Sequence, residues 1–356
     1  MTTGLTKLSL GQLRNLTLQC GINRSGTKGV LIQRLDQTLR DHRPLGPDAR
    51  VLSIDLGIRN LAYSLLSPPL ARPSRAQRGS KAGPAVHAWR PLSLAPAPGA
   101  AAGDQDQGPA DGADEALAAD FSPASLSRIA LRLVQERLLP LRPTHVLIER
   151  QRFRSGGGSA VYEWTVRVNS LEAMLYATFA TLQALGHWDG VVLPIDPKRV
   201  STFLLEDQKV VGDDGVERGG EDPDCVPGAK KAGGKARKDA TGAEVKSSGR
   251  VARENKKRKI DLVGNWLVHH KLAMAGVEAT AMRIAFLEKW LPKEHLGKRS
   301  AEGLALKGTA ESIRKLDDVA DSLLQGVAWL RWEENKTKLR QGHQFDLVGV
   351  QQESSA

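Results

Sequence analysis

The segment from Val51 to Gly57 constrains the fold most, because it has the composition of a core strand that contains one carboxylate. Apolar residues flank Asp55 on both sides, in the order Val-Leu-Ser-Ile-Asp-Leu-Gly. An ionised carboxylate in such a strand is costly unless it is paired or binds a cation. Gly57 allows the chain or a ligand to approach closely. The segment therefore predicts a strand with a functional acid, then a tight turn and a second strand over residues 60–66.

Two further acidic positions follow along the chain. Glu149 ends an apolar strand expected at residues 144–149, and open α/β sheets bind ligands near strand ends. Late in the chain, Asp317, Asp318 and Asp321 lie in a segment with helical periodicity. Asp317 with Asp321, or Asp318 with Asp321, would place two carboxylates on one helix face. Because like charges at that spacing destabilise a helix, a bound cation would explain them.

Carboxylate oxygens suit Mg²⁺ or Mn²⁺, and two such ions can hold both the attacking and the leaving oxygen of a phosphodiester. Each position alone has an ordinary alternative, a helix cap for an aspartate or a salt bridge for a strand-end glutamate. The order strand Asp, strand Glu and late helical Asp pair is typical of a ribonuclease H-like nuclease. Spacing alone does not choose between Asp317 and Asp318.

The pattern of strands and helices predicts an α/β fold with a mixed sheet flanked by helices. The main domain is expected at residues 50–335, with flexible insertions at 68–120 and 206–252 and a tail at 336–356. Further elements are expected as strands at 85–94 and 190–195 and as helices at 122–139, 159–186, 197–205, 255–272, 278–291 and 311–334.

Residues 1–43 are expected to form a separate helical unit, which Pro44 and Pro47 end. Two apolar stripes flank a turn in which Gly26 provides backbone freedom and Ser25 or Thr27 caps the second helix. The unit resembles the SAP motif, a helix-turn-helix DNA-binding module with a Ser-Gly-x-Lys turn. That resemblance makes Lys28 a candidate DNA contact, whereas the plainer alternative is a generic helical hairpin.

The net charge of +11 indicates a polyanionic partner, and nucleic acid is the first expectation. Two cysteines without metal-type spacing indicate a reducing compartment, and no apolar run is long enough for a membrane span. The alternatives for the basic segments are a solvated loop and a targeting-like run. The candidate phosphate contacts are Arg150, Gln151, Arg152, Arg154, Ser155, Gly156, Lys256, Lys257, Arg258 and Lys259.

The segments Ser53–Ala62, Ile148–Arg152 and Asp317–Gln325 resemble the fungal mitochondrial Holliday junction resolvases, which are related to bacterial RuvC. Arg150–Met174 and Asn255–Val263 are also similar to that family. The resemblance implies a ribonuclease H-like fold. It implies that Asp55, Glu149 and Asp321 bind metal, with Asp317 favoured as the fourth ligand by the family pattern and Asp318 by the bacterial relatives.

The resemblance further implies Mg²⁺ or Mn²⁺, with two ions per site, and a mitochondrial homodimer that cuts opposed strands of a four-way DNA junction. No membrane and no nucleotide cofactor are expected. The helix at 159–186 is the expected dimer interface, unless it only packs on the sheet. Its apolar positions are Val161, Trp164, Val168, Leu171, Leu175 and Phe179. The competing functions are a non-catalytic DNA-binding scaffold and another ribonuclease H-like nuclease.

Overall fold

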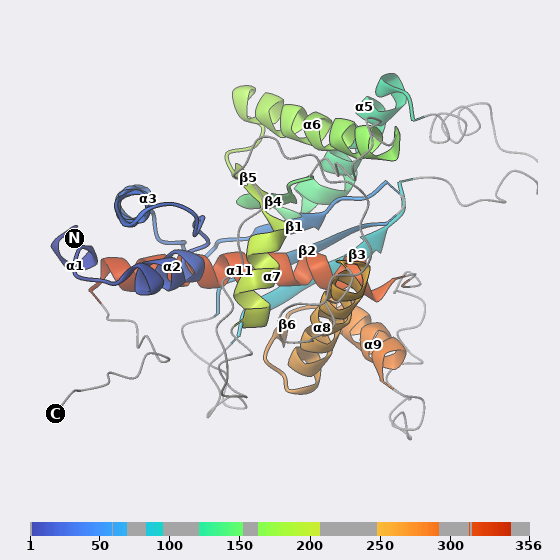
Figure 1. Cartoon of the computed structure of the whole chain (residues 1–356). Coiled ribbons are helices and arrows are strands. Elements are labelled where there is room, and N and C mark those ends of the chain that lie inside the picture. The colour runs from blue at the N-terminus through green and yellow to red at the C-terminus, as the bar shows by residue number, and fades with distance from the viewer. Residues whose placement is uncertain are drawn as a thin grey trace, which may run out of the picture.

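The computed structural model describes residues 2–58, 60–69, 83–94, 121–151, 163–206, 248–291, 313 and 315–342. Its centre is a six-stranded mixed sheet in the order β5-β4-β1-β2-β3-β6 (Figure 1). This arrangement confirms the expected α/β class. Within the described residues, no helix is long and apolar enough to cross a membrane.

Three antiparallel strands begin the sheet, and parallel strands extend it on either side. β1 (Val51–Asp55), β2 (Leu61–Ser67) and β3 (Ala85–Leu92) pair antiparallel. β4 (His145–Glu149) pairs parallel to β1, and β5 (Val191–Ile195) pairs parallel to β4. The short β6 (Ala273–Met274), which was not expected, pairs parallel to β3. Because β1 and β4 are parallel neighbours, their acidic last residues lie at the same edge of the sheet.

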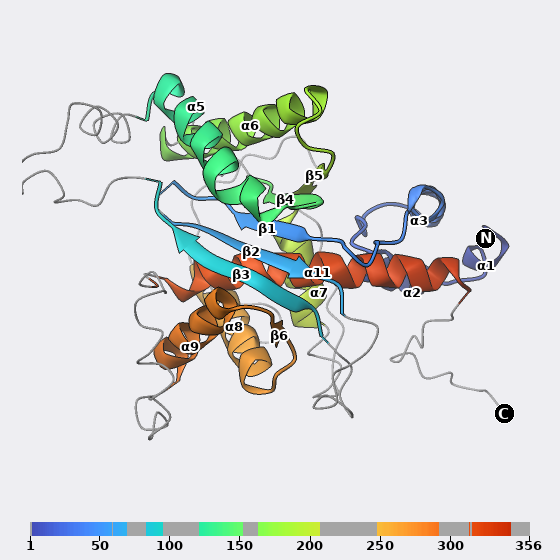
Figure 2. The same ribbon diagram turned by 180° about the vertical axis from the view of Figure 1, so that it is seen from behind.

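Helices cover both faces of the sheet (Figure 2). Side-chain alternation along β1 separates two cores. Leu52 and Ile54 pack with α5 (Pro123–Arg132), the π-helix η2 (Leu133–Leu138) and α6 (Glu163–Ala184), and the short 3-10 helix η3 (Leu139–Leu141) precedes β4. Val51 packs on the opposite face with α7 (Pro197–Glu206), α8 (Ser248–Val268), α9 (Val277–Trp290) and α11 (Leu316–Arg340). Asp55 has the parity of Val51 and therefore points to the α11 side.

The long helix α11 lies directly against the sheet, because Gly326 removes the side chain at the contact. A Cβ atom at that position would lie 2.4 Å from Cδ1 of Leu66. Gln325, which is buried, donates from Nε2 to the carbonyl oxygens of Ile54 in β1 and Leu147 in β4, both at 3.3 Å. Trp89 in β3 donates from its indole nitrogen to the carbonyl of Val319 at 2.9 Å. These contacts hold the first turns of α11 beside the carboxyl ends of β1 and β4.

The N-terminal unit consists of α1 (Thr2–Leu5), α2 (Leu10–Gln19) and α3 (Lys28–Asp41) around its own small core. Ser9 and Gln12 form a capping box at the start of α2. Gly26 has a φ of +120°, as the expected turn requires. The expected hydroxyl cap is wrong in detail, because Thr27 occupies the cap position of α3 without a side-chain hydrogen bond. Assignment of this unit as a SAP module stays a prediction.

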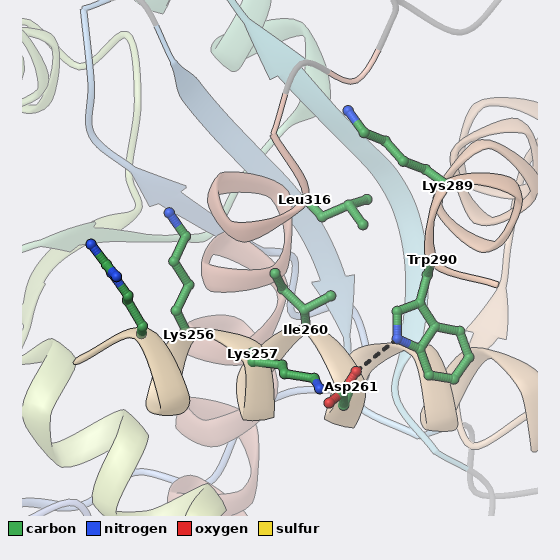
Figure 3. A pocket seen from close by; sticks show the side chains of 8 residues that line it. Lys256, Lys257, Ile260, Asp261, Lys289, Trp290 and Leu316 are labelled. Carbon is green, nitrogen blue, oxygen red and sulfur yellow. Dashed lines mark hydrogen bonds between the residues drawn. The ribbon is translucent and has the colours of Figure 1, made fainter. Parts of the chain in front are cut away.

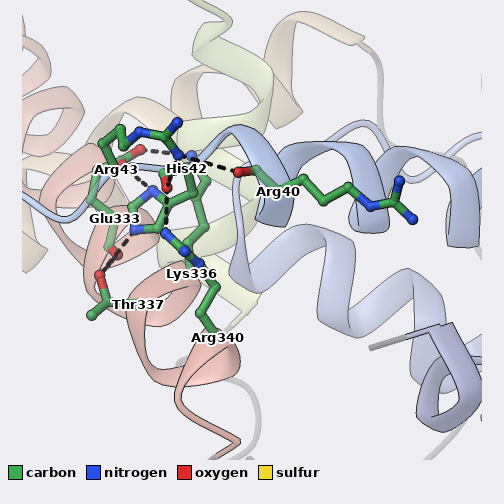
Figure 4. Close-up of polar contacts among 7 residues, drawn as sticks. All are labelled: Arg40, His42, Arg43, Glu333, Lys336, Thr337 and Arg340. Atoms are coloured by element: carbon green, nitrogen blue, oxygen red, sulfur yellow. Dashed lines mark hydrogen bonds and ion pairs between the residues drawn. The ribbon is translucent and has the colours of Figure 1, made fainter.

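A buried polar cluster attaches the N-terminal unit to the second half of α11 (Figure 4). His42 contacts Glu333 through Nδ1 at 3.1 Å and Thr337 through Nε2 at 3.0 Å. Arg340 donates to the carbonyl oxygen of His42. Leu18 of α2 also joins the main core. The unit therefore packs closely against the larger domain.

Two expected boundaries differ from the structure. α11 continues to Arg340, so residues 336–340 are helical and do not belong to a tail. α8 begins at Ser248, inside the range expected to be an insertion. The first expected insertion contains the described residues 83–94, which include β3. Residues 70–82, 95–120 and 207–247 of the two expected insertions, and residues 343–356, lie outside the described residues.

The expected dimer interface on α6 is wrong for four of its six positions. Val168, Leu171, Leu175 and Phe179 are buried in the sheet core, so this stripe only packs on the sheet. Val161 and the Trp164 side chain lie outside the described residues.

Candidate active site

Asp55 and Glu149 form the centre of the acidic site at the carboxyl ends of β1 and β4. Ile54 pairs with Ile148 in the sheet, which places the next residue of each strand side by side. The two carboxyl groups share a side-chain hydrogen bond. Burial raises the pKa of Asp55 well above its usual range, and the charges of Glu149 and Asp321 raise it further. Burial also raises the pKa of Glu149, although the hydrogen bond with Asp55 opposes this effect.

The first two turns of α11 add the carboxylates of Asp317, Asp318 and Asp321 to this centre. Burial raises the pKa of Asp321, while the Lys259 ammonium group lowers it. Burial raises the pKa of Asp318 to about 6, and the charge of Asp317 adds to the effect. The charges of Asp321 and Asp318 both raise the pKa of Asp55, so α11 and the sheet contribute to one electrostatic unit. Such a concentration of destabilised carboxylates is typical of a site that holds cations.

Two lysines of α8, one helical turn apart, neutralise part of this charge. Lys259 places Nζ at 2.6 Å from Oδ1 and 2.7 Å from Oδ2 of Asp321. Lys256 forms an ion pair with Oδ2 of Asp317. The lysines therefore occupy the space beside the acids where a bound cation would supply the same positive charge.

The residues expected to contact phosphates lie in different surroundings in the structure. Lys256 and Lys259 face the acids, whereas Arg258 donates to the carbonyl oxygen of Leu205 at 3.5 Å. Lys257 faces a groove next to the site. Lys28 begins α3 in the N-terminal unit. The C-cap residue of that helix, His42, contacts Thr337, about 24 Å along α11 from Asp321 at 1.5 Å per residue.

The segment after Glu149 begins at the site and then leaves the described residues. The Arg150 side chain is exposed, while its backbone N–H donates to the Ile195 carbonyl at 2.8 Å. The backbone N–H of Gln151 donates to Oε2 of Glu172 at 3.2 Å. The remaining expected contacts of this segment, Arg152, Arg154, Ser155 and Gly156, lie outside the described residues.

Sequence reasoning missed Asp196, which follows β5 directly. Its Oδ1 accepts a hydrogen bond from the backbone N–H of Lys198 at 2.9 Å at the start of α7. Its charge also contributes to the raised pKa of Glu149. The signal was present in the sequence, because an acid that directly follows a strand neighbouring β4 must lie at the same sheet edge.

The donor set fits a hard divalent cation in its chemistry but is not preassembled for one. Among the residues that the structure describes, no three histidine, cysteine, aspartate or glutamate side chains are arranged to hold a metal ion. Lys256 and Lys259 hold the α11 carboxylates, and Asp55 and Glu149 hold each other. The carboxylates among these groups offer oxygen ligands, which Mg²⁺ and Mn²⁺ prefer.

The mixed sheet, with acids at the ends of two parallel strands and on a late helix, defines a ribonuclease H-like fold. A solved structure of similar fold is the yeast mitochondrial Holliday junction resolvase Ydc2, with a TM-score of 0.53 and 23% identity. The match covers 94% of this chain and 98% of that chain.

The family model described as mitochondrial resolvase Ydc2 / RNA splicing MRS1 matches residues 51–339. The chain therefore belongs to this family, which confirms the resemblance inferred from its acidic segments. A curated relative is the mitochondrial cruciform cutting endonuclease 1 of Schizosaccharomyces pombe, 32% identical over 173 residues. The alignment covers 49% of this chain and 56% of that protein, so it spans about half the length of the relative.

Proposed function

We propose that the chain is a divalent-metal-dependent endonuclease that resolves four-way DNA junctions. The observation that carries the proposal is the joint electrostatic unit of Asp55, Glu149, Asp318 and Asp321 at one sheet edge. A curated relative is named a cruciform cutting endonuclease, and a solved relative is named a Holliday junction resolvase. Both relatives are named mitochondrial, so the proposed place of action is the mitochondrion.

In this proposal, Asp55, Glu149 and Asp321 hold Mg²⁺ or Mn²⁺, together with Asp317 or Asp318. Two such ions, when bound, supply an activated water and stabilise the leaving oxygen. The ends of β1 and β4 and the first turns of α11 keep these carboxylates close together at one edge of the sheet. Asp317 forms an ion pair with Lys256, and Asp321 forms one with Lys259. The charge of Asp318 instead raises the pKa of Asp55. Separate Asp317→Asn and Asp318→Asn variants distinguish them, because only loss of the ligand should weaken metal binding.

Lys259 has a double role in the proposed mechanism. Without a metal, its ammonium group offsets the charge of Asp321, which is otherwise costly in a partly buried position. A cation held by Asp321 would supply the positive charge that Lys259 provides in this structure. The Lys259 ammonium group, beside the acids, would then be able to contact a phosphate oxygen of the bound strand.

A nucleic-acid-binding protein without cleavage is the second candidate, because the family description also includes an RNA splicing member. Such a protein has no need for buried, mutually repelling carboxylates. All five acidic residues are present here, and at least three of them act on the pKa of Asp55. This set favours the nuclease over the scaffold.

The proposed active form is a homodimer. A four-way junction is nearly two-fold symmetric, so paired cuts require two sites related by the same symmetry. Within the described residues, one chain supplies one such acidic set. Because the apolar stripe of α6 packs on the sheet, a partner would have to use the outer face of that helix, where Val166 is 49% exposed, or another surface.

A direct test compares a synthetic four-way junction with a linear duplex of the same sequence. The protein should cut the junction in Mg²⁺, leave it intact in EDTA, and cut the duplex far more slowly. Sedimentation of the junction complex should give two chains per junction. Binding of the junction without cleavage in either Mg²⁺ or Mn²⁺ would instead favour the scaffold.

A further inference from the structure

A groove of about 480 Å³ lies between α8, α9 and the start of α11 (Figure 3). This volume is in the range of about 300–1,000 Å³ that is usual for small-molecule sites. Its lining combines basic groups at the rim and apolar groups in the middle with one carboxylate, that of Asp261. The lining residues are Arg253, Lys256, Lys257, Ile260, Asp261, Lys289, Trp290 and Leu316.

Trp290 is fixed in the groove by two contacts. Its indole N–H donates to Oδ1 of Asp261 at 2.9 Å. The ring packs against Gly264 of α8, where an added Cβ atom would lie 2.4 Å from Cδ2 and from Cε2. The glycine therefore creates the space in which the ring lies. The side chain remains partly exposed where it lines the groove, next to Ile260 and Leu316.

The groove opens directly beside the proposed active site. Lys256 lines the groove and also forms the ion pair with Asp317. Leu316, on the groove floor, immediately precedes the acidic turn of α11. Lys289 is held at the rim, because its Nζ donates to the carbonyl oxygen of Ile313 at 2.7 Å. A DNA strand whose phosphate lies at the acids therefore has this groove next to it.

We propose that this groove holds one unstacked nucleotide of the DNA strand, adjacent to the phosphate that is cut. The base lies on the floor of Ile260, Leu316 and Trp290, and its phosphate faces Arg253, Lys257 and Lys289. A phosphate alone would not use the apolar floor, and an apolar ligand would not use the basic rim. A nucleotide matches both, because a base can stack on an aromatic side chain while its backbone contacts basic groups. The inference rests on the proposed function, since the acids locate the cut.

The groove also bears on which DNA the protein selects, and not only on how DNA is bound. Unstacking a base has an energetic cost, which is smallest where stacking is already interrupted. A four-way junction interrupts stacking where its strands exchange, whereas a linear duplex does not. The groove therefore gives a physical reason for a preference for branched DNA, and it makes Trp290 and Arg253 determinants of substrate selection.

Photo-crosslinking tests the proposal without any need for cleavage. Four-way junctions carry 5-iododeoxyuridine at single positions around the strand exchange, and they are bound to the full chain in EDTA and irradiated. Mass spectrometry then locates the attachment. The expected result is attachment to Trp290, or to its neighbours in the groove, from one or two positions next to the cut site. Attachment only elsewhere on the chain, or at equal yield from every position, overturns the proposal.

Matched variants and a parallel cleavage assay make the result specific. Arg253→Ala with Lys257→Ala should reduce the groove crosslink several-fold. Lys271→Ala, which removes an exposed charge just beyond the end of α8 and outside the groove lining, should leave it unchanged. Equal yields from both would overturn the assignment of the rim. If the same junctions are cut in Mg²⁺ but give no groove crosslink, only this inference fails. If they are neither bound nor cut, the proposed function fails with it.

Discussion

Replacement of Lys259 by methionine tests the proposed role of the lysine as a substitute for the metal charge. The change keeps most of the aliphatic stem and removes the ammonium group that lies 2.6 and 2.7 Å from the two oxygens of Asp321. Without a cation, Asp321 is then left among like charges. We expect a loss of stability in EDTA at neutral pH and a much smaller loss in saturating Mg²⁺.

The size of the loss follows from the burial of the pair. Removal of one partner costs about 3–5 kcal/mol in a buried pair and about 0–1 kcal/mol at the surface. The side chains of Lys259 and Asp321 are 19% and 28% exposed, between these limits. We therefore expect a decrease of about 2 kcal/mol in the free energy of unfolding, measured by urea denaturation in EDTA.

Two controls isolate the charge. Lys338→Met breaks a pair with Glu334 whose side chains are 44% and 54% exposed, and it should have almost no effect. Asp321→Asn should remove most of the loss when it is combined with Lys259→Met, because the uncompensated charge is gone. The reasoning is refuted if Lys259→Met is as stable as the unaltered protein in EDTA, or if its loss persists undiminished in the double variant.

Further predictions concern the docking of the N-terminal unit, the titration of the acidic site and the phosphate contacts. Gly21→Ala should lower the free energy of unfolding by about 1–3 kcal/mol. Gly21 has a φ of +68°, and a Cβ atom there would lie 2.4 Å from Cδ2 of Trp332. An unchanged thermal midpoint would contradict the docking of the N-terminal unit. The pKa of Asp318 is raised to about 6 in the folded protein, so as the pH rises the unfolded chain loses this proton before the folded protein does. The free energy of unfolding in EDTA should therefore fall as the pH rises from about 4 to about 6. Mg²⁺ should correspondingly bind more tightly at pH 7 than at pH 5 in calorimetric titrations, and equal affinities would show that these carboxylates are not the ligands. Junction affinity measured by fluorescence anisotropy should fall steeply with salt, and a flat dependence would argue against phosphate contacts.

The acidic site was accessible from sequence because two simple regularities locate it. Parallel neighbouring strands bring their last residues together, and the helical spacing of Asp317, Asp318 and Asp321 supplies a second group on one helix. The mixed sheet and most helices followed from apolar periodicity. The two-residue strand β6 carries no periodic signal, so it could not be predicted.

Contacts between distant segments were the part that sequence could not provide. The basic run of α8 indicated nucleic acid, but nothing in its composition showed that Lys256 and Lys259 would face the acids while Arg258 faces α7. The apolar stripe of α6 did not reveal whether it meets the sheet or a partner, and the sheet proved to cover Leu171 and Phe179. The docking of His42 on Glu333 depends on two segments that are far apart in the chain.

The most direct measurement of the central claim is single-turnover cleavage of a four-way junction by the Asp55→Asn variant, alongside its junction affinity. Asparagine is close in size to aspartate but lacks the charge needed to hold the ions. We predict that cleavage in Mg²⁺ falls by at least about a thousandfold, as for loss of a catalytic carboxylate elsewhere, while junction affinity is retained. Cleavage at an undiminished rate by Asp55→Asn would contradict the assignment of this acidic cluster as the active site.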